Sequence, residues 1–294
     1  MSSAAAASIK WLSVVGAGQM GIGIGLVAAR VAKLNVQFID SSADQLTKGL
    51  AFLDKLLVKD VGRGRCTEEE RSDIKARIST AGSVAEMADT ADFVVEAVSE
   101  NADLKRRVLA QLSERLPETA VLATNTSSIS ITKLAAATRR PDRVIGMHFM
   151  NPVPVMRLVE VIPGLQSSAA TLQTTLALAQ RLGKTTTMAQ DVPGFIANRL
   201  LMPYINEAFV ALQEGIASRE DIDTTMVLGA NNPMGPLTLA DFIGLDTCLA
   251  IMQVLHAELG DSKYRPAVLL QKHVDAGWLG VKSGKGVYDY PPKK

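Results

Sequence analysis

Three histidines occur in the chain, and only one of them stands where a sheet would present it to a ligand. His256 and His273 lie within apolar patterns of helical spacing, which are typical of structural or surface histidines. His148 follows the apolar run Val144–Met147, at the end of an expected strand. Open α/β sheets bind ligands at the carboxyl ends of their strands, so His148 is the candidate general base.

A single carboxylate interrupts the next apolar run, Arg157–Ile162, twelve residues after His148. Burying an unpaired carboxylate costs free energy, so a buried Glu160 needs a partner, and the His148 imidazole is the simplest one. The alternative is a surface glutamate on an edge strand. If the pair forms, Glu160 stabilises the imidazolium that is produced when His148 accepts a proton.

A glycine-rich turn stands between another expected strand and a helix. Gly16 permits the tight turn, Gly18 lets the backbone approach a pyrophosphate, and Gly21 lets the helix pack closely on the strand. The next expected strand, Val36–Ile39, ends in Asp40, nineteen residues after Gly21, where a carboxylate can bind the ribose hydroxyls. This combination predicts a dinucleotide site, against the alternative of an ordinary turn and strand end. The predicted cofactor-binding residues here are Gly16, Gly18, Gln19, Met20, Gly21 and Asp40.

The carboxylate of Asp40 also predicts which dinucleotide is bound. It would repel a 2′-phosphate, so the expected cofactor is NAD rather than NADP. A dinucleotide cofactor implies hydride transfer, and removing a hydride from an alcohol requires a base for the hydroxyl proton. His148 can supply that base.

Polar residues elsewhere leave two interpretations open. The segment Thr124–Ser128 follows a strand and either caps the next helix or offers spare hydroxyls to a ligand. Asn198 is either a polar helix residue or a cleft group. The helix-rich insertion Ala43–Ala81 carries Lys55 and Lys59, and it is either a solvated hairpin or a basic arm that meets a phosphorylated ligand.

The elements that must position these residues alternate along the first two-thirds of the chain. Short β-branched apolar runs alternate with longer helical patterns, which predicts βαβ units and a mostly parallel sheet. The runs expected as buried parallel strands are Leu12–Val15, Val36–Ile39, Phe93–Val95, Val121–Ala123 and Val144–Met147.

From Asp191 onward the pattern becomes a series of apolar helices separated by Gly and Pro. The sequence therefore predicts a Rossmann-type domain over residues 1–190 with a helical hairpin insertion, then an all-α domain over residues 191–294. The small helical segment carries more apolar surface than it can bury alone, so we expect it to pack against a second copy.

Composition excludes several other classes of protein. The 294 residues carry a formal charge of +1, which does not favour nucleic acid or an anionic membrane as partner. Cys66 and Cys248 are far apart, so a disulfide framework and a cysteine-based zinc site are not expected. The uncharged stretch Trp11–Ala29 is long enough for a membrane span, but its five glycines favour the dinucleotide turn. Neither an Arg-rich transit peptide nor a Ser-Lys-Leu ending is visible, and the expected compartment is the cytoplasm or the mitochondrial matrix.

These motifs together resemble the short-chain L-3-hydroxyacyl-CoA dehydrogenases of fatty-acid β-oxidation and their bacterial 3-hydroxybutyryl-CoA relatives. HFMNPVP followed by LVEVI, and PGFIANR, are specific to this group. The resemblance covers nearly the whole chain, through VVGAGQMGIGI, VVEAVSEN, NTSSISIT, GMHFMNPVPVMRLVEVI, DVPGFIANRLLMPYINEA, LGANNPMGPLTLADFIGLDT and KSGKGVYDY.

The resemblance implies a role for each matching residue. His148 is the base that takes the 3-hydroxyl proton, Glu160 orients it, and Ser127 and Asn198 hydrogen-bond the substrate oxygens. Lys55 and Lys59 would meet the coenzyme A moiety of an acyl-CoA substrate, although Phe52-Leu53-Asp54 replaces a serine-bearing basic helix of some members. The family also dimerises through its helical domain. The residues implied along NAD are Glu100, Lys105, Asn151 and Lys282.

Three functions follow as alternatives. The first is NAD-dependent oxidation of L-3-hydroxyacyl-CoA to 3-ketoacyl-CoA. The second is a sister activity, either reduction of acetoacetyl-CoA with NADPH or oxidation of another hydroxy acid. The third is an NAD-binding protein without catalysis, which would have no reason to combine Ser127, His148, Glu160 and Asn198.

Overall fold

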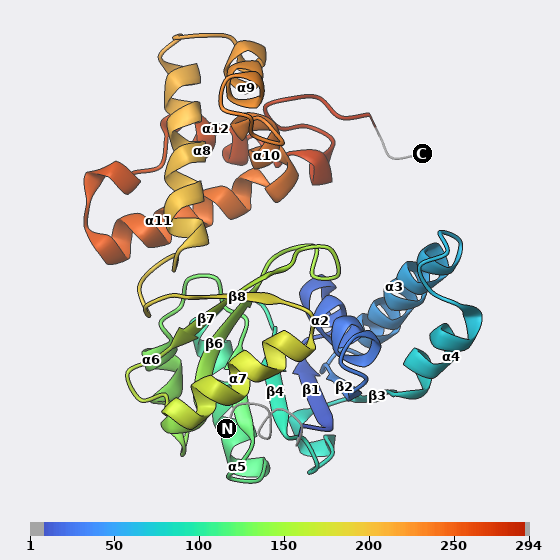
Figure 1. The fold of residues 1–294 in the computed structure, drawn as a ribbon. Coiled ribbons are helices and arrows are strands. Elements are labelled where there is room, and N and C mark those ends of the chain that lie inside the picture. Colours follow the sequence, from blue (N-terminus) through green and yellow to red (C-terminus); the bar gives the residue numbers. More distant parts are fainter. Residues whose placement is uncertain (1–8, 292–294) are drawn as a thin grey trace. The chain divides into compact units, whose positions relative to one another are not determined.

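The computed structural model describes residues 9–291 of the chain. The chain divides into two units, Met1–Val192 and Pro193–Lys294 (Figure 1). Unit 1 holds an eight-stranded sheet with the strand order β3-β2-β1-β4-β5-β6-β7-β8. Its strands are β1 (Trp11–Val15), β2 (Asn35–Ile39), β3 (Ile78–Ala81), β4 (Phe93–Glu96), β5 (Val121–Thr124), β6 (Val144–Phe149), β7 (Leu158–Pro163) and β8 (Thr185–Met188).

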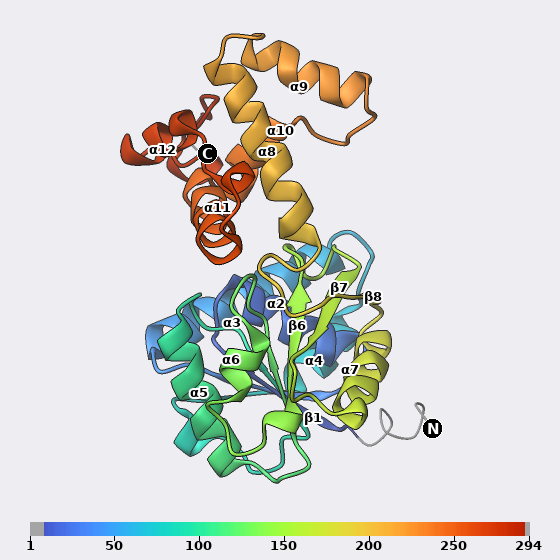
Figure 2. The same cartoon turned by 90° about the vertical axis from the view of Figure 1, so that its left-hand side faces the viewer.

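Helices cover both faces of this sheet (Figure 2). Residues of α2 and α7, such as Ile22 and Leu178, share one buried apolar cluster with the strands, while α5 and α6 cover the opposite face. The helices of unit 1 are α2 (Gln19–Arg30), α3 (Ala43–Val61), α4 (Glu68–Ala76), α5 (Ala102–Arg115), α6 (Ile131–Ala135) and α7 (Ala169–Arg181). The expected Rossmann-type, mostly parallel sheet is confirmed.

The order of the strands reverses direction between β1 and β4, which lie next to each other in parallel register. This is the topological switch point, where open α/β sheets bind their ligands. The turn after β1 packs on the chain after β4, because a Cβ at Gly16 would lie 2.5 Å from the Ala97 carbonyl oxygen. Residues that follow β1, β4, β5 and β6 therefore meet at one edge of the sheet.

Three details of the sheet differ from expectation. The insertion Ala43–Ala81 ends in a strand, β3, which pairs in parallel with β2. The polar strand β8 was not predicted, and it pairs in parallel with β7. Strand β6 reaches Phe149, so His148 belongs to the strand itself.

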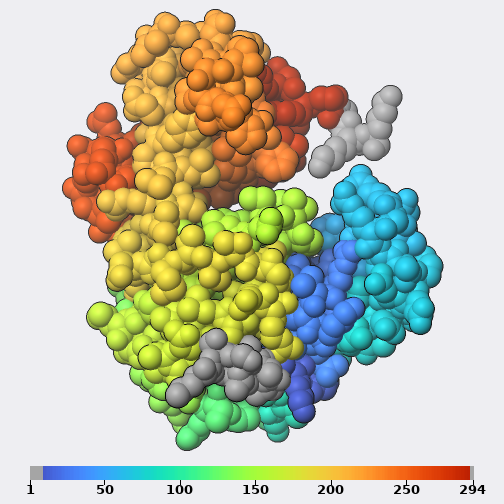
Figure 3. All heavy atoms as spheres, viewed as in Figure 1, coloured from blue at the N-terminus to red at the C-terminus, as the bar shows by residue number. Residues whose placement is uncertain are grey.

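The insertion between β2 and β3 forms a helical hairpin, α3 and α4, at the side of unit 1 (Figure 3). Helix α4 begins with a capping box between Thr67 and Glu70. Asp54 of α3 accepts hydrogen bonds from Arg71 Nη2 at 2.9 Å and Lys75 Nζ at 3.0 Å. These two cations lower the pKa of Asp54 and tie the two helices together.

Unit 2 is helical, as expected for the second domain. Its core contains Met202, Phe209, Leu249 and Leu255. The closing segment packs on a buried carboxylate, because Asp241 accepts hydrogen bonds from the backbone N–H groups of Val287 and Tyr288. The helices are α8 (Ala197–Gln213), α9 (Arg219–Leu228), α10 (Pro236–Ile243), α11 (Leu245–Leu259) and α12 (Val268–Asp275).

Among residues 9–291, none of the helices alone has both the length and the apolarity of a membrane span. Helices α10 and α11 have that length and composition only when taken together across a 97° bend. The uncharged stretch Trp11–Ala29 is divided between strand β1 and helix α2.

Candidate active site

The central feature of the site is a hydrogen-bonded imidazole and carboxylate. His148 and Glu160 are direct partners in the antiparallel register of β6 and β7. His148 Nδ1 lies 2.7 Å from Glu160 Oε2, and the two side chains are 8% and 1% exposed. Strand β7 lies between β6 and β8, so Glu160 is not the surface residue of an edge strand. The structure thus brings together the two residues that the sequence paired.

A hydroxyl group lies on the other side of the same imidazole. Ser127 Oγ is 3.2 Å from His148 Nε2. Asn125 Oδ1 accepts a hydrogen bond from the Phe149 N–H at 2.8 Å, which ties the end of β5 to the end of β6 beside this contact. The imidazole therefore has Glu160 on one nitrogen and a hydroxyl on the other, the arrangement of a base with its orienting acid.

The turn that carries Ser127 is held by Glu100. Glu100 Oε1 accepts hydrogen bonds from Thr126 Oγ1 at 2.5 Å, from the Ser127 N–H at 2.8 Å and from the Ser128 N–H at 3.2 Å. These contacts use one oxygen of a carboxylate that is 39% exposed. Glu100 thus lies beside the turn and keeps a solvent-accessible side.

Lys105 is buried, and its ammonium group faces two carboxylates. Its Nζ lies 2.8 Å from Glu96 Oε1 and 3.4 Å from Glu100 Oε2. Sequence reasoning missed Glu96, which is fully buried at the end of β4. The sequence does contain a sign that Glu96 is buried, because this acidic residue directly follows the apolar run Phe93–Val95. Glu160 stands within a later apolar run in the same way.

The glycine-rich turn has the geometry that a pyrophosphate requires. Gly16 has φ +106°, and a Cβ at Gly21 would lie 1.9 Å from the Gly16 carbonyl oxygen, so both positions demand glycine. A Cβ at Gly18 would meet no atom within 4 Å, which leaves the backbone accessible. Gly18 is the N-cap residue of α2 and provides no side-chain cap, so the helix N-terminus can bind an anion.

Asp40 holds this turn from the end of β2. Its carboxylate accepts hydrogen bonds from the Ala17 N–H at 2.9 Å and the Ser42 N–H at 3.0 Å. Gln45 of α3 donates to the Ala17 carbonyl oxygen at 2.9 Å, so Ala17 is held on both sides. An open glycine, an uncapped helix N-terminus and a strand-end carboxylate together fit the phosphates and ribose of NAD.

Two other predicted cofactor residues meet near the same helix. Gln19 Nε2 donates to Asn151 Oδ1 at 3.0 Å, which links the start of α2 to the chain after β6. Met20, by contrast, packs against the apolar core of unit 1. The role of Met20 toward the cofactor stays a prediction.

The remaining predicted residues lie on α3 of unit 1 and in unit 2. Lys55 and Lys59 are exposed on α3. Asn198 is the second residue of α8 in unit 2. Lys282, also in unit 2, donates to Asp246 Oδ2 at 2.7 Å. The roles of these four residues remain predictions.

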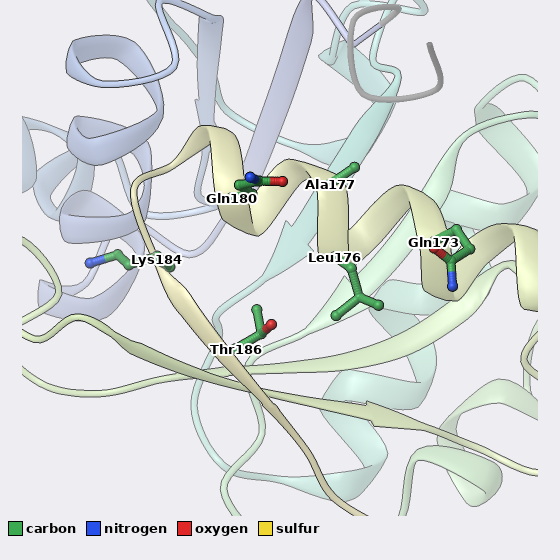
Figure 4. Close-up of a pocket in the computed structure, with 6 residues that line it drawn as sticks. All are labelled: Gln173, Leu176, Ala177, Gln180, Lys184 and Thr186. Atoms are coloured by element: carbon green, nitrogen blue, oxygen red, sulfur yellow. The ribbon is translucent and has the colours of Figure 1, made fainter. Parts of the chain in front are cut away.

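A pocket of about 270 Å³ lies between α7 and β8 (Figure 4). Lys184 at its edge donates to the carbonyl oxygens of Val153 and Met156, and burial lowers the pKa of its ammonium group. The pocket contains none of the predicted site residues. Its lining residues are Gln173, Leu176, Ala177, Gln180, Lys184 and Thr186.

Comparisons with known proteins match both units. The NAD-binding domain of 3-hydroxyacyl-CoA dehydrogenase matches residues 12–192, and the C-terminal domain of the same family matches residues 194–290. The match confirms the expected family and NAD as the cofactor.

Individual relatives cover almost the whole chain. The 3-hydroxybutyryl-CoA dehydrogenase of Bradyrhizobium diazoefficiens is 51% identical over 97% of this chain and 97% of its own length. That of Clostridioides difficile is 45% identical over 95% of this chain and 99% of its own. The crystal structure of (S)-3-hydroxybutyryl-CoA dehydrogenase PaaH1 from Ralstonia eutropha is 50% identical, with a TM-score of 0.92, and covers 97% of this chain and 100% of its own. With both of its units matched, the chain belongs to the 3-hydroxyacyl-CoA dehydrogenase family.

Proposed function

We propose that the protein catalyses the reversible, NAD-dependent oxidation of an L-3-hydroxyacyl-CoA to the 3-ketoacyl-CoA, as in fatty-acid β-oxidation. The observation that supports this most directly is that the His148 imidazole contacts Ser127 on one side and Glu160 on the other. His148 lies 3.2 Å from the hydroxyl of Ser127 and 2.7 Å from the carboxylate of Glu160. A purely structural histidine has no need of both contacts at the ligand-binding edge of the sheet.

In this proposal His148 is the general base. The hydrogen bond to Glu160 keeps a proton on Nδ1, which leaves the Nε2 lone pair available for the proton of the 3-hydroxyl group. As the C3–H bond breaks and the C3–O bond becomes a carbonyl, the hydroxyl proton moves to Nε2. Glu160 stabilises the resulting imidazolium. When bound, NAD supplies the acceptor for the hydride that leaves C3.

Ser127 and Asn198 are proposed to hydrogen-bond the oxygens of the substrate. Ser127 Oγ lies 3.2 Å from His148 Nε2, so a substrate oxygen bound beside this contact would reach both groups. The hydroxyl can donate to a ketone oxygen in one direction of the reaction and accept from an alcohol in the other.

The proposed substrate is a short acyl-CoA thioester. The relatives that are named 3-hydroxybutyryl-CoA dehydrogenases support this choice, since they match the chain along nearly their whole lengths. Lys55 and Lys59, exposed on α3, are proposed to attract the phosphates of coenzyme A.

The proposed cofactor preference is for NAD over NADP. The Asp40 carboxylate accepts hydrogen bonds from two backbone N–H groups, and these bonds hold the carboxylate in place at the ribose end of the proposed site. A fixed negative charge there disfavours a 2′-phosphate. Equal catalytic efficiency with NADH and NADPH would contradict this preference.

An absorbance assay tests the function. The loss of NADH absorbance is measured with acetoacetyl-CoA as substrate, and in separate reactions with free acetoacetate and other keto acids. Activity with the thioester alone is expected. Activity with free acids would favour a related hydroxy-acid dehydrogenase, and a preference for NADPH would favour a reductive role.

We further propose that unit 2 mediates a homodimer. Several of its large apolar side chains are exposed in a single chain, and covering them would stabilise the protein. A monomeric mass by light scattering at micromolar concentration would contradict the proposal. These residues are Leu200, Ile216, Leu228 and Phe242.

A further inference from the structure

A buried ion pair in unit 1 has no part in the proton transfer described above. Glu96 and Lys105 are 0% and 1% exposed, and Lys105 Nζ lies 2.8 Å from Glu96 Oε1. Charged side chains are rarely buried to this extent, because each loses its hydration. A buried ion pair often adds little to the stability of a protein, so stability alone does not explain why this pair occurs here.

Glu96 joins three segments that meet at the switch point. Besides Lys105 of α5, its Oε1 accepts a hydrogen bond from the Val98 N–H at 2.8 Å. Its Oε2 accepts a hydrogen bond from Thr124 Oγ1 of β5 at 2.6 Å. The Asn125 N–H, next along the chain, donates to the backbone oxygen of Glu96 at 2.8 Å. Glu96 therefore fixes the point from which the Ser127 turn leaves the sheet.

Lys105 connects Glu96 to the turn by a second route. Its ammonium group lies 3.4 Å from Glu100 Oε2, while Glu100 Oε1 accepts the N–H groups of Ser127 and Ser128. One cation thus stands between two carboxylates. Because Glu96 shares the ammonium group of Lys105, that group attracts Glu100 less strongly than it would alone.

We propose that Glu96 is a positioning residue for the reaction. It acts through Lys105 and Glu100 on the turn that places Ser127 Oγ beside His148 Nε2. This inference rests on the proposed function. Without the charge of Glu96, the ammonium group of Lys105 has one carboxylate left, and attraction draws Glu100 away from the Ser127 and Ser128 N–H groups.

The test replaces the carboxylate by its amide, Glu96→Gln. A displaced turn should lower kcat for acetoacetyl-CoA and NADH by roughly 10- to 100-fold, since small misplacements of reacting groups have effects of this size. The matched control is Asp223→Asn, a buried carboxylate of unit 2 that accepts the Leu237 and Thr238 N–H groups. The control should lower the melting temperature and leave kcat within about twofold.

A double-mutant cycle separates positioning from general destabilisation. If Glu96 acts through the turn, Glu96→Gln should reduce kcat much less in a Ser127→Ala background than in the wild type. Hydrogen exchange provides a readout without catalysis, because the peptide that contains the Ser127 and Ser128 amides should exchange faster in Glu96→Gln than in Asp223→Asn. Full additivity with unchanged exchange would overturn the proposal.

A second variant is available if Glu96→Gln fails to fold. The pair Glu96→Gln with Lys105→Met removes both buried charges, so no uncompensated ion remains inside the protein. Because the ammonium group that draws Glu100 away is also removed, this variant should fold and exchange at Ser127 at the wild-type rate. Rapid exchange at Ser127 in the folded double variant would overturn the proposal. An inactive wild type with acetoacetyl-CoA would instead contradict the proposed function.

Discussion

Glu160 faces His148 directly across two antiparallel strands, and the register of β6 and β7 sets this relationship. Directly opposed residues on an antiparallel pair lie within side-chain reach, which is why a spacing of twelve residues produces a 2.7 Å contact. Both members of the pair thus come from the rigid sheet. This arrangement holds the imidazole in one orientation before a ligand binds.

Replacement of His148 by glutamine should remove the base and leave the cofactor site intact. General-base assistance is worth about 10²- to 10⁴-fold, so kcat should fall on that scale. The residues that hold the glycine-rich turn, such as Asp40, do not depend on this imidazole. The Kd for NADH, measured by fluorescence, should therefore change little, and a loss of NADH binding would place His148 in a different role.

Glu160→Gln should slow turnover for a different reason. The amide is nearly isosteric but carries no charge, so it stabilises the imidazolium less and can hold the ring in the wrong tautomer. We expect kcat to fall by at least about tenfold, with the Kd for NADH unchanged. Steady-state kinetics at saturating NADH test this expectation, and a wild-type kcat would show that the carboxylate charge is not used.

The sequence predicted the parts of the fold that depend on apolar patterning. The run around Glu160 was recognisable because one charge stood among buried β-branched residues, and burial of a charge demands a partner. Strand β8 was missed because Thr185, Thr186 and Thr187 have no apolar alternation, and pairing with β7 determines their conformation.

The Glu96 and Lys105 pair was missed for a related reason. Lys105 stands nine residues after Glu96, within a helical pattern in which an exposed lysine is common. Its partner Glu96 is also held by Thr124 of β5, from a distant part of the chain. Contacts between segments far apart in the sequence leave no local pattern.

Gly49→Ala tests whether helix α3 supports the dinucleotide turn. A Cβ at Gly49 would lie 2.7 Å from the Ala17 carbonyl oxygen and 2.9 Å from Ile22 Cδ1. Alanine favours a helix by up to about 1 kcal/mol over glycine. A clash with backbone in a packed site costs about 1–3 kcal/mol, so the clash should prevail.

The expected result of Gly49→Ala is a severalfold rise in KM for NAD with a lower melting temperature. Thr47→Ala on the same helix is the matched control, since Thr47 is exposed and its hydroxyl bonds only within the helix, to Ala43. It should leave KM for NAD unchanged. Equal KM values for Gly49→Ala and the wild type would show that the turn does not depend on α3.

Cys248 should make the protein less stable at alkaline pH. Its side chain is fully buried in α11, and burial, with smaller contributions from Asp246 and Asp241, raises the pKa of the thiol to about 12. An unfolded cysteine has a pKa of about 8.5. Between these values the unfolded chain releases a proton that the folded chain retains, so stability is complete below the lower pKa and falls as pH rises. The contribution from one such group is about 1.4 kcal/mol per pH unit. The free energy of unfolding of the wild type and of Cys248→Ala is measured in urea at pH 8 and pH 10.5. The stability advantage of the wild type should shrink or reverse at the higher pH. The same difference at both pH values would contradict the prediction.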